Sequence, residues 1–210
     1  VKNVKKAINL RLISDKPIGF LLSGGVDSSL VCAIATYFLR APIYTFCIGI
    51  KDTGTDFKFA RSVAKKIKSY HTEVVFTVEE AINSLPEIIY ATETYDTTTI
   101  RASIGQFLIA KYIKENTDIK VILVGEGPDE VCSSYLFNWN CPNEKELHKA
   151  AIDYVQKIHH FDVRRVDRCL SYFGLEARVP LLDPSFIKAY WKIPQSQRTP
   201  QYKGIEKWWL

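Results

Sequence analysis

Two short segments combine glycines with the oxygen-bearing side chains that anion and metal chemistry requires. Residues 23–29 read Ser-Gly-Gly-Val-Asp-Ser-Ser, and residues 125–130 read Gly-Glu-Gly-Pro-Asp-Glu. Glycines let a backbone come close to an anionic ligand and adopt conformations that other residues avoid. Carboxylates beside such a ligand are chemically reasonable when a cation lies between the two. Both segments are therefore candidates for one site that holds an anion together with a metal ion.

Residues 23–29, called the phosphate loop below, follow an apolar run and open a predicted helix. The N–H groups and the dipole at a helix start favour phosphate, and serine hydroxyls add hydrogen-bond donors. This is not a Walker A loop, because the turn contains no lysine. Asp27 would repel a phosphate unless Mg²⁺ intervened, and Mg²⁺ commonly binds one or two carboxylates plus phosphate oxygens. A simple helix-capping role for Asp27 stays open.

Strands and helices are predicted to alternate along most of the chain. Apolar runs predict strands at 18–22, 43–48, 73–76 and 119–124. Helical periodicity predicts helices at 1–13, 26–39, 56–68, 77–91 and 99–115. Asp56 and Thr77 are predicted to be N-caps, and Thr77 forms a capping box with Glu80.

This alternation predicts an α/β fold with a doubly wound, mostly parallel sheet. From residue 143 onward the pattern predicts a helical C-terminal part, with an extended segment at 179–182. In such sheets ligands bind beyond the carboxyl ends of the strands. Residues 125–130, called the acidic loop below, and the phosphate loop both follow predicted strands, so we expect them at the same edge of the sheet.

The composition excludes several classes of protein. The chain has 210 residues, of which 47% are hydrophobic and 24% charged, with a formal net charge of +5. These values are typical of a globular protein. Its basic residues show none of the clustering expected of a nucleic-acid-binding protein, so no nucleic-acid partner is predicted. No apolar stretch approaches the ~18 residues that a membrane span needs, and no signal peptide is apparent.

The cysteines and the chain ends add two expectations. Five cysteines without a C-x-x-C pair indicate reduced thiols rather than disulfides or zinc ligands, which predicts a cytoplasmic location. The four histidines show no metal-ligand spacing. Val1 is not a methionine, and the chain stops within the apolar run Trp208-Trp209-Leu210. We therefore expect one domain, residues 1–210, that is a piece of a longer protein.

The sequence Ser-Gly-Gly-x-Asp-Ser after an apolar run resembles the pyrophosphate-binding loop of N-type ATP pyrophosphatases. Further segments, in order, resemble the synthetase domain of glutamine-dependent asparagine synthetases. They are residues 20–29, 45–49, 93–103, 125–130, 176–183 and 204–207. The resemblance implies an adenine nucleotide α-hydrolase-like fold and carbon–nitrogen ligase activity. Aspartate would attack the α-phosphate of ATP to give β-aspartyl-AMP and pyrophosphate, and ammonia would then displace AMP to give asparagine.

The resemblance also implies residue roles. The expected ATP-binding residues are Leu22, Ser23, Gly24, Gly25, Asp27, Ser28 and Ser29, with Ile48 and Gly125 near the adenosine. Asp27 and Asp129 would share Mg²⁺. Glu126 would take a proton from the attacking ammonium or orient the amine.

Two further pairs are less specific. Arg101 could bind the carboxylate of aspartate and Asp96 its ammonium group, although a structural ion pair between them is an equal alternative. Arg178 and Asp183 are interpreted as a buried architectural pair.

The sequence also departs from the family. The glutaminase domain of these enzymes is absent from the 210 residues, so ammonia would be free or come from a glutaminase domain or subunit. A family lysine that contacts the departing phosphates would lie beyond Leu210, so these residues alone are expected to bind ATP better than they turn it over.

Other functions remain open. One alternative is a relative that adenylates another carboxylate, as β-lactam synthetases do. A second is a nucleotide-binding module without catalytic activity. Val124 stands where the family usually has a serine, which removes one hydroxyl near ATP and is consistent with this alternative. A homodimer is also possible.

Overall fold

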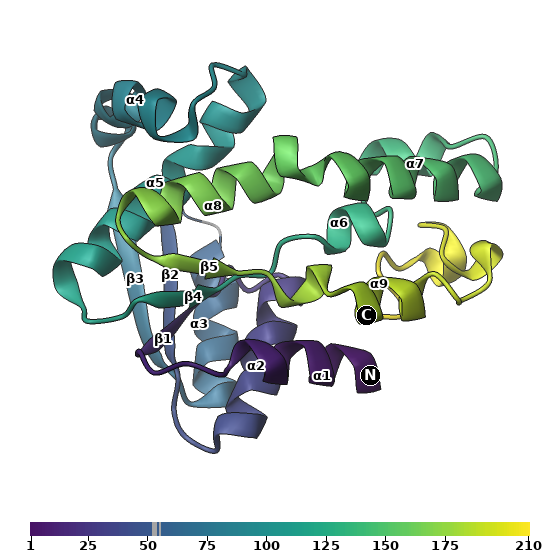
Figure 1. Cartoon of the computed structure of the whole chain (residues 1–210), viewed down its shortest axis with the longest axis horizontal. Helices are drawn as coiled ribbons and strands as arrows, with labels where there is room; N and C mark the ends of the chain where they lie inside the picture. Colours follow the sequence, from purple (N-terminus) through teal and green to yellow (C-terminus); the bar gives the residue numbers. More distant parts are fainter. Residues whose placement is uncertain (52–53, 55) are drawn as a thin grey trace.

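Five parallel strands form the centre of the computed structural model, which describes residues 1–51, 54 and 56–210 (Figure 1). The strands are β1 (Ile18–Leu21), β2 (Tyr44–Ile50), β3 (Tyr70–Phe76), β4 (Val121–Leu123) and β5 (Glu176–Arg178). They lie in the order β3-β2-β1-β4-β5, and each neighbouring pair is parallel. The predicted parallel α/β sheet is confirmed.

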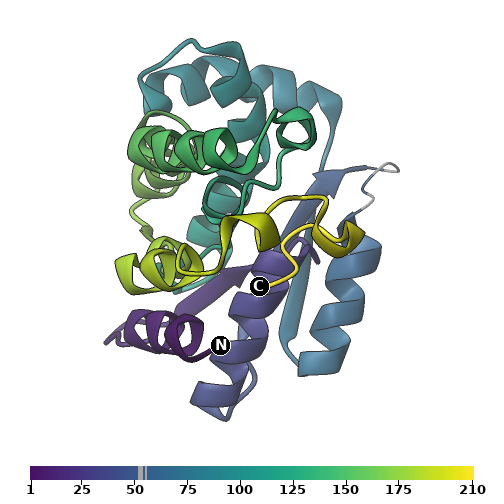
Figure 2. The same ribbon diagram turned by 90° about the vertical axis from the view of Figure 1, so that its right-hand side faces the viewer.

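Helices cover both faces of this sheet (Figure 2). The α-helices are α1 (Lys2–Arg11), α2 (Val26–Leu39), α3 (Asp56–Ile67), α4 (Val78–Thr92), α5 (Thr97–Asn116), α6 (Pro128–Val131), α7 (Glu144–Lys157), α8 (Asp162–Tyr172) and α9 (Pro184–Tyr190). Short 3₁₀ helices span Leu136–Asn140, Ile158–His160, Pro180–Leu182, Gln195–Gln197 and Tyr202–Gly204. In Figure 1, α7 and α8 lie nearly end to end along the long axis of the molecule.

The two faces of the sheet have separate cores, because successive strand residues point to opposite sides. On one face, Phe20 and Leu123 pack with buried residues of α1, α2 and α3. On the other face, Phe46 and Ile122 pack with buried residues of α5 and α8. The sequence prediction of a doubly wound sheet is therefore confirmed, and apolar strands buried on both sides are its physical cause.

Local signals placed the start of α4 correctly and the start of α3 to within one residue. Thr77 and Glu80 form the predicted capping box: the Thr77 hydroxyl accepts from the Glu80 amide at 3.1 Å, and the Glu80 carboxylate accepts from the Thr77 amide at 2.7 Å. Asp56 is the first residue of α3 rather than a residue before it. In that first turn its carboxylate still interacts favourably with the helix dipole.

Two expectations for the C-terminal part are wrong. The segment predicted to be extended contains the 3₁₀ helix Pro180–Leu182, and the strand, β5, lies just before it. Arg178 and Asp183 do not pair with each other. Arg178 Nη1 donates to the carbonyls of Arg11 and Ile13, each at 2.7 Å. Asp183 instead accepts from Arg11 Nη1 at 2.5 Å, so both residues fasten α1 to the C-terminal part.

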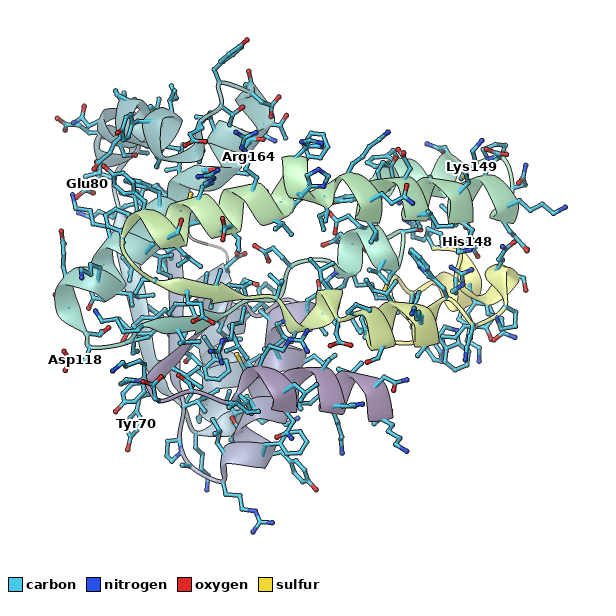
Figure 3. The ribbon with its side chains drawn as sticks, viewed as in Figure 1. Tyr70, Glu80, Asp118, His148, Lys149 and Arg164 are labelled. Atoms are coloured by element: carbon cyan, nitrogen blue, oxygen red, sulfur yellow. The ribbon has the colours of Figure 1, made fainter. Side chains whose placement is uncertain are left out.

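Other long-range contacts fix the helices around the site. Arg164 of α8, labelled in Figure 3, donates to the carbonyls of Thr92 at 3.0 Å and Glu93 at 2.8 Å, which joins α8 to the end of α4. All five cysteines have free thiols. In the part of the chain that the structure describes, no helix has the length and apolar character that crossing a bilayer requires.

Candidate functional site

The phosphate loop and the acidic loop meet beyond the carboxyl ends of β1 and β4. β1 pairs with β2 on one side and with β4 on the other, so the chain order reverses there. Open α/β sheets bind ligands at such switch points. A cavity of about 340 Å³ lies at this place, and it is lined by both loops, by the end of β2 and by residues of α5 and α8.

Most of the residues that the sequence predicts for the site line this cavity. From the first half of the chain these are Leu22, Ser23, Gly25, Asp27, Ser28 and Ile48. From the acidic loop they are Gly125, Glu126 and Asp129. Gly24, Ser29, Asp96 and Arg101 are not among the residues that line it.

The phosphate loop has the geometry of an anion-binding turn. The hydroxyls of Ser23 and Ser28 lie 3.0 Å apart, and the Gly25 amide donates to the Ser23 hydroxyl at 3.3 Å. Gly24 has a φ of +87°, and a Cβ there would lie 2.5 Å from the Ala60 amide nitrogen of α3. Among the described residues, no side chain caps α2 at Gly25. The first amides of α2 can therefore bind an anionic ligand.

Gly125 lets the two loops touch through their backbones. A Cβ at this position would lie 2.8 Å from the Ser28 amide nitrogen and 3.1 Å from the Asp27 carbonyl carbon. Those neighbours are main-chain atoms of α2 and cannot move aside as a flexible side chain would. A residue larger than glycine would therefore push the two loops apart.

Asp27 and Asp129 share one cation, the ammonium group of Lys207. Lys207 Nζ lies 2.5 Å from Asp27 Oδ2 and 2.9 Å from Asp129 Oδ1. Burial raises the pKa of Asp27, although Lys207 acts in the opposite direction. Burial also favours the neutral amine of Lys207, but the attraction of both carboxylates outweighs this and raises its pKa. The two acidic side chains therefore lie close enough together for a single cation to neutralise both.

These two aspartates fit a magnesium ion. Asp27 Oδ1 is buried and has no hydrogen-bond partner among the described residues. In the described ranges 1–51, 54 and 56–210, no three His, Cys, Asp or Glu side chains converge as metal ligands. Phosphate oxygens and water would have to complete the coordination, as is usual for Mg²⁺.

Glu126 is held at the cavity wall by side chains from two helices. Gln106 of α5 donates through Nε2 to Glu126 Oε1 at 2.5 Å. Arg165 of α8 donates through Nε to Gln106 Oε1 at 3.1 Å, and its Nη2 lies 3.8 Å from Glu126 Oε1. Arg165 also pairs with Asp162 at 2.7 Å. Burial raises the pKa of Glu126, although Arg165 opposes this shift.

A second buried carboxylate lies beside this group. Glu130 of α6 accepts a hydrogen bond from the Tyr135 hydroxyl. Burial raises the pKa of Glu130 to about 7, and the bond from Tyr135 acts against that rise. The cavity therefore combines three carboxylates of the acidic loop and α6 with Asp27 and Arg165.

Sequence reasoning gave no site role to Gln106, Asp162, Arg165 or Lys207. Lys207 belongs to the segment Gly-Ile-Glu-Lys at 204–207, which carried the family resemblance without a role. Asp162 and Arg165 are spaced i,i+3 on a helix, a spacing that is usually a solvent-facing ion pair. No sequence signal distinguishes that case from a pair facing a cavity.

Asp96 and Arg101 lie at the start of α5, outside the cavity lining. Asp96 Oδ2 accepts from the Thr99 amide at 2.7 Å and from the Thr99 hydroxyl at 2.8 Å, so it caps the helix. Arg101 is exposed. Their role in binding aspartate stays a prediction.

Comparison with known proteins relates the chain to one family along its length. The family described as Asparagine synthase matches residues 2–142 and 139–210. The glutamine-hydrolysing asparagine synthetase of Homo sapiens is 44% identical over 206 residues, covering 96% of this chain and 36% of that protein. The enzyme of Gallus gallus is 42% identical over 211 residues, covering 98% of this chain and 37% of that protein. The chain thus spans little more than a third of these relatives.

A solved structure shows a similar fold at low sequence identity. The U34-tRNA thiolase NcsA from Methanococcus maripaludis superposes with a TM-score of 0.51 and 15% identity, over 92% of this chain and 63% of that chain. This likeness concerns the fold alone.

Proposed function

Because this chain belongs to the asparagine synthase family, we propose that it carries out the ATP-dependent conversion of aspartate to asparagine. One observation carries the proposal: Asp27 and Asp129, from two loops at the switch point of the sheet, lie within contact of one cation. This arrangement suits a magnesium-bound triphosphate rather than a neutral ligand.

The reaction consists of two substitutions. The β-carboxylate of aspartate attacks the α-phosphorus of ATP and pyrophosphate leaves, which gives β-aspartyl-AMP. Ammonia then attacks the activated carbonyl carbon, AMP leaves, and asparagine is formed after loss of a proton. Both steps concentrate negative charge on oxygen, so positioning and fixed electrostatics supply much of the rate enhancement.

Each wall of the cavity has a part in this proposal. The phosphate loop binds the polyphosphate through its amides and through Ser23 and Ser28, while Ile48 and Gly125 contact the adenosine. Asp27 and Asp129 would hold Mg²⁺, which would supply charge neutralisation for the leaving pyrophosphate. Gly24 and Ser29 do not line the cavity, and Gly24 lies against the backbone of α3 at Ala60.

Glu126 is the proposed proton acceptor in the second step. Its position at the cavity wall and its raised pKa suit a group that removes a proton from the attacking amine. Gln106 and Arg165 orient it through the contacts described above. A carboxylate with an ordinary, low pKa would be a weaker base.

Two arginines are candidates for binding the carboxylate of the substrate. Arg165 lines the cavity and presents the planar donor group that recognises carboxylates. Arg101 lies on α5, the helix that carries Gln106, about 7.5 Å from Gln106 toward the N-terminus of the helix, by the rise of 1.5 Å per residue. Arg165→Lys and Arg101→Lys separate them, because the variant at the binding residue has the larger increase in KM for aspartate.

The wider setting belongs to the same proposal. Residues 1–210 form one catalytic domain in the cytoplasm, and its substrates are ATP, aspartate and ammonia. Ammonia is free or is supplied by a glutaminase domain or subunit, in keeping with the glutamine-hydrolysing relatives. A homodimer is compatible with this reaction, and no step in it calls on a residue from a second copy.

Pyrophosphate release tests the function. With ATP, Mg²⁺, aspartate and ammonium chloride we expect pyrophosphate, AMP and asparagine in equal amounts. Release with a different carboxylic acid, and not with aspartate, would support an enzyme like the β-lactam synthetases. ATP binding without release in the presence of any acid would indicate a silent nucleotide-binding module.

A further inference from the structure

Lys207 lies at the centre of the phosphate site although it comes from the C-terminal segment. Its side chain is 11% exposed, and its ammonium group contacts carboxylates from both loops. Among the residues that the structure describes, it is the one basic side chain within ion-pair distance of Asp27 or Asp129. The neutralisation of two site carboxylates therefore depends on a residue that the reaction scheme above does not use.

The C-terminal segment, residues 201–210, is anchored on both sides of Lys207. Trp139 Nε1 donates to Glu206 Oε1 at 3.1 Å, and Trp209 Nε1 donates to the Gln197 carbonyl at 3.1 Å. The rings of Tyr202 and Trp209 stack with centroids 6.2 Å apart. Lys207 itself has a φ of +53°, a conformation that few lysines adopt. The segment around it thus places the ammonium group where it is.

The ammonium group and Mg²⁺ would compete for the same two carboxylates. Lys207 Nζ lies 2.5 Å from Asp27 Oδ2 and 2.9 Å from Asp129 Oδ1, whereas Mg²⁺ would need oxygens at about 2.0–2.1 Å. Lys207 contacts Asp27 Oδ2 and Asp129 Oδ1, whereas Asp27 Oδ1 has no partner among the described residues. A metal ion bound by these aspartates would therefore lie close to the ammonium group, and the two positive charges would repel each other. This repulsion favours movement of the ammonium group away from the carboxylates when the metal binds, and the nearest new anionic partner would be the polyphosphate that arrives with the metal.

We propose that Lys207 is a polyphosphate-binding residue that neutralises Asp27 and Asp129 until Mg·ATP binds and then donates its hydrogen bonds to polyphosphate oxygens. The proposal rests on the proposed function only in taking Mg·ATP as the ligand. A lysine side chain carries its compact charge on a flexible four-carbon stem, so the ammonium group can change partners without movement of the anchored backbone.

The test compares Lys207→Met with the matched control Lys203→Met. Lys203 lies in the same segment and also has a positive φ of +56°, but its ammonium group lies over the rings of Tyr202 at 5.9 Å and Trp208 at 4.9 Å. Two equilibrium titrations of the full chain are made: Mn²⁺ alone, followed by electron paramagnetic resonance, and inorganic pyrophosphate with Mg²⁺, followed by calorimetry. Lys207→Gln is measured in parallel in case the methionine variant does not fold.

The two titrations should change in opposite directions. Without Lys207, the two carboxylates are open to a metal, so affinity for Mn²⁺ alone rises. Affinity for magnesium pyrophosphate falls by about 10- to 100-fold, the loss expected for a charge-assisted hydrogen bond. Lys203→Met leaves both affinities unchanged.

The other outcomes overturn the proposal. A fall in both affinities would mean that Lys207 only holds the loops in shape, and no change in pyrophosphate affinity would mean that it does not reach the phosphates. These binding results need no aspartate. A wild-type chain that binds magnesium pyrophosphate but releases no pyrophosphate from ATP in the presence of aspartate would therefore refute the proposed function. The Lys207 proposal would still be decided by the two titrations.

Discussion

Gln106 Nε2 and Glu126 Oε1 are 2.5 Å apart, which joins α5 to the loop after β4 across the cavity. Arg165 of α8 contacts both residues, so side chains from two helices hold the Glu126 carboxylate. Its position is thus set before any substrate arrives. Burial keeps its pKa above the ordinary value for glutamate, which favours proton acceptance near neutral pH.

The first prediction is that Glu126→Gln abolishes amide formation and preserves nucleotide binding. The amide has nearly the same shape but cannot accept the proton, so asparagine formation should fall by about 10²- to 10⁴-fold. The Kd for Mg·ATP should stay within a few-fold of the wild-type value. If ATP binding fell as steeply as turnover, Glu126 would not be the proton acceptor.

The second prediction concerns pH. Glu126 must be ionised to accept a proton, and its pKa is raised, so the rate should fall as pH decreases through that raised value. The fall should therefore begin at a higher pH than for an exposed glutamate. Initial rates are measured at a fixed concentration of free ammonia, so that titration of ammonium does not contribute.

Glu130 needs its own control in this experiment, because its pKa is about 7. The pH profile is repeated with Glu130→Gln, which should keep the acid limb if Glu126 causes it. Disappearance of that limb in the Glu130 variant would assign the titration to Glu130 instead.

The third prediction is that Gly125→Ala weakens ATP binding by at least tenfold with a smaller effect on folding. The new methyl group would lie 2.8 Å from the Ser28 amide nitrogen, and this contact displaces the phosphate loop. Gly174→Ala is the control, because no atom lies within 4 Å of its new Cβ, although its φ of +72° makes alanine strained there. Calorimetric titration with Mg·ATP and thermal unfolding separate the two effects. Equal ATP affinities for both variants would contradict the prediction.

The sequence was sufficient for the parts of the site that are local in the chain. The phosphate loop and the acidic loop each follow an apolar strand, and parallel strands end at one edge of the sheet, so their meeting could be predicted. On this basis Asp27 and Asp129 are predicted to lie close together, and in the structure both carboxylates contact the ammonium group of Lys207. The capping box of Thr77 and Glu80 was predicted for a similar reason, since it depends on four consecutive residues.

The parts that sequence reasoning missed depend on contacts between distant segments. Arg165 shares its helix with the exposed charged residues Asp167 and Arg168, and Lys207 is separated from Asp27 by 180 positions. Neither residue has a local signal that distinguishes it from a surface cation. β5 was missed because three residues, Glu-Ala-Arg, give no apolar run. Arg178 and Asp183 were wrongly paired because α1, which supplies the partners of both, is far away in the sequence.

The fourth prediction uses that misassigned aspartate. Asp183 caps α9 through the Ser185 amide at 2.8 Å and pairs with Arg11 of α1 at 2.5 Å. Asp183→Ala removes both contacts and should lower the free energy of unfolding by about 2–3 kcal/mol, from the usual costs of a lost cap and a broken, mostly buried pair. Asp183→Asn retains part of the cap and should cost about 1 kcal/mol less.

Urea unfolding at two pH values completes this test, and the sign follows from the pKa of Asp183. Burial alone would raise that pKa, but the bonds from Ser185 and Arg11 outweigh it and lower the pKa. The stabilisation from its ionised form is therefore fully present above the unfolded value of about 3.9 and is lost as pH falls through the lower folded value. The difference in the free energy of unfolding between wild type and Asp183→Asn should be largest near pH 7 and should decrease in acid.

The control is Asp153→Ala, which removes an exposed pair with Lys157 and should lower the free energy of unfolding by at most about 0.5 kcal/mol. Equal losses for Asp153→Ala and Asp183→Ala would show that the α1–α9 contact contributes no more to stability than a surface pair.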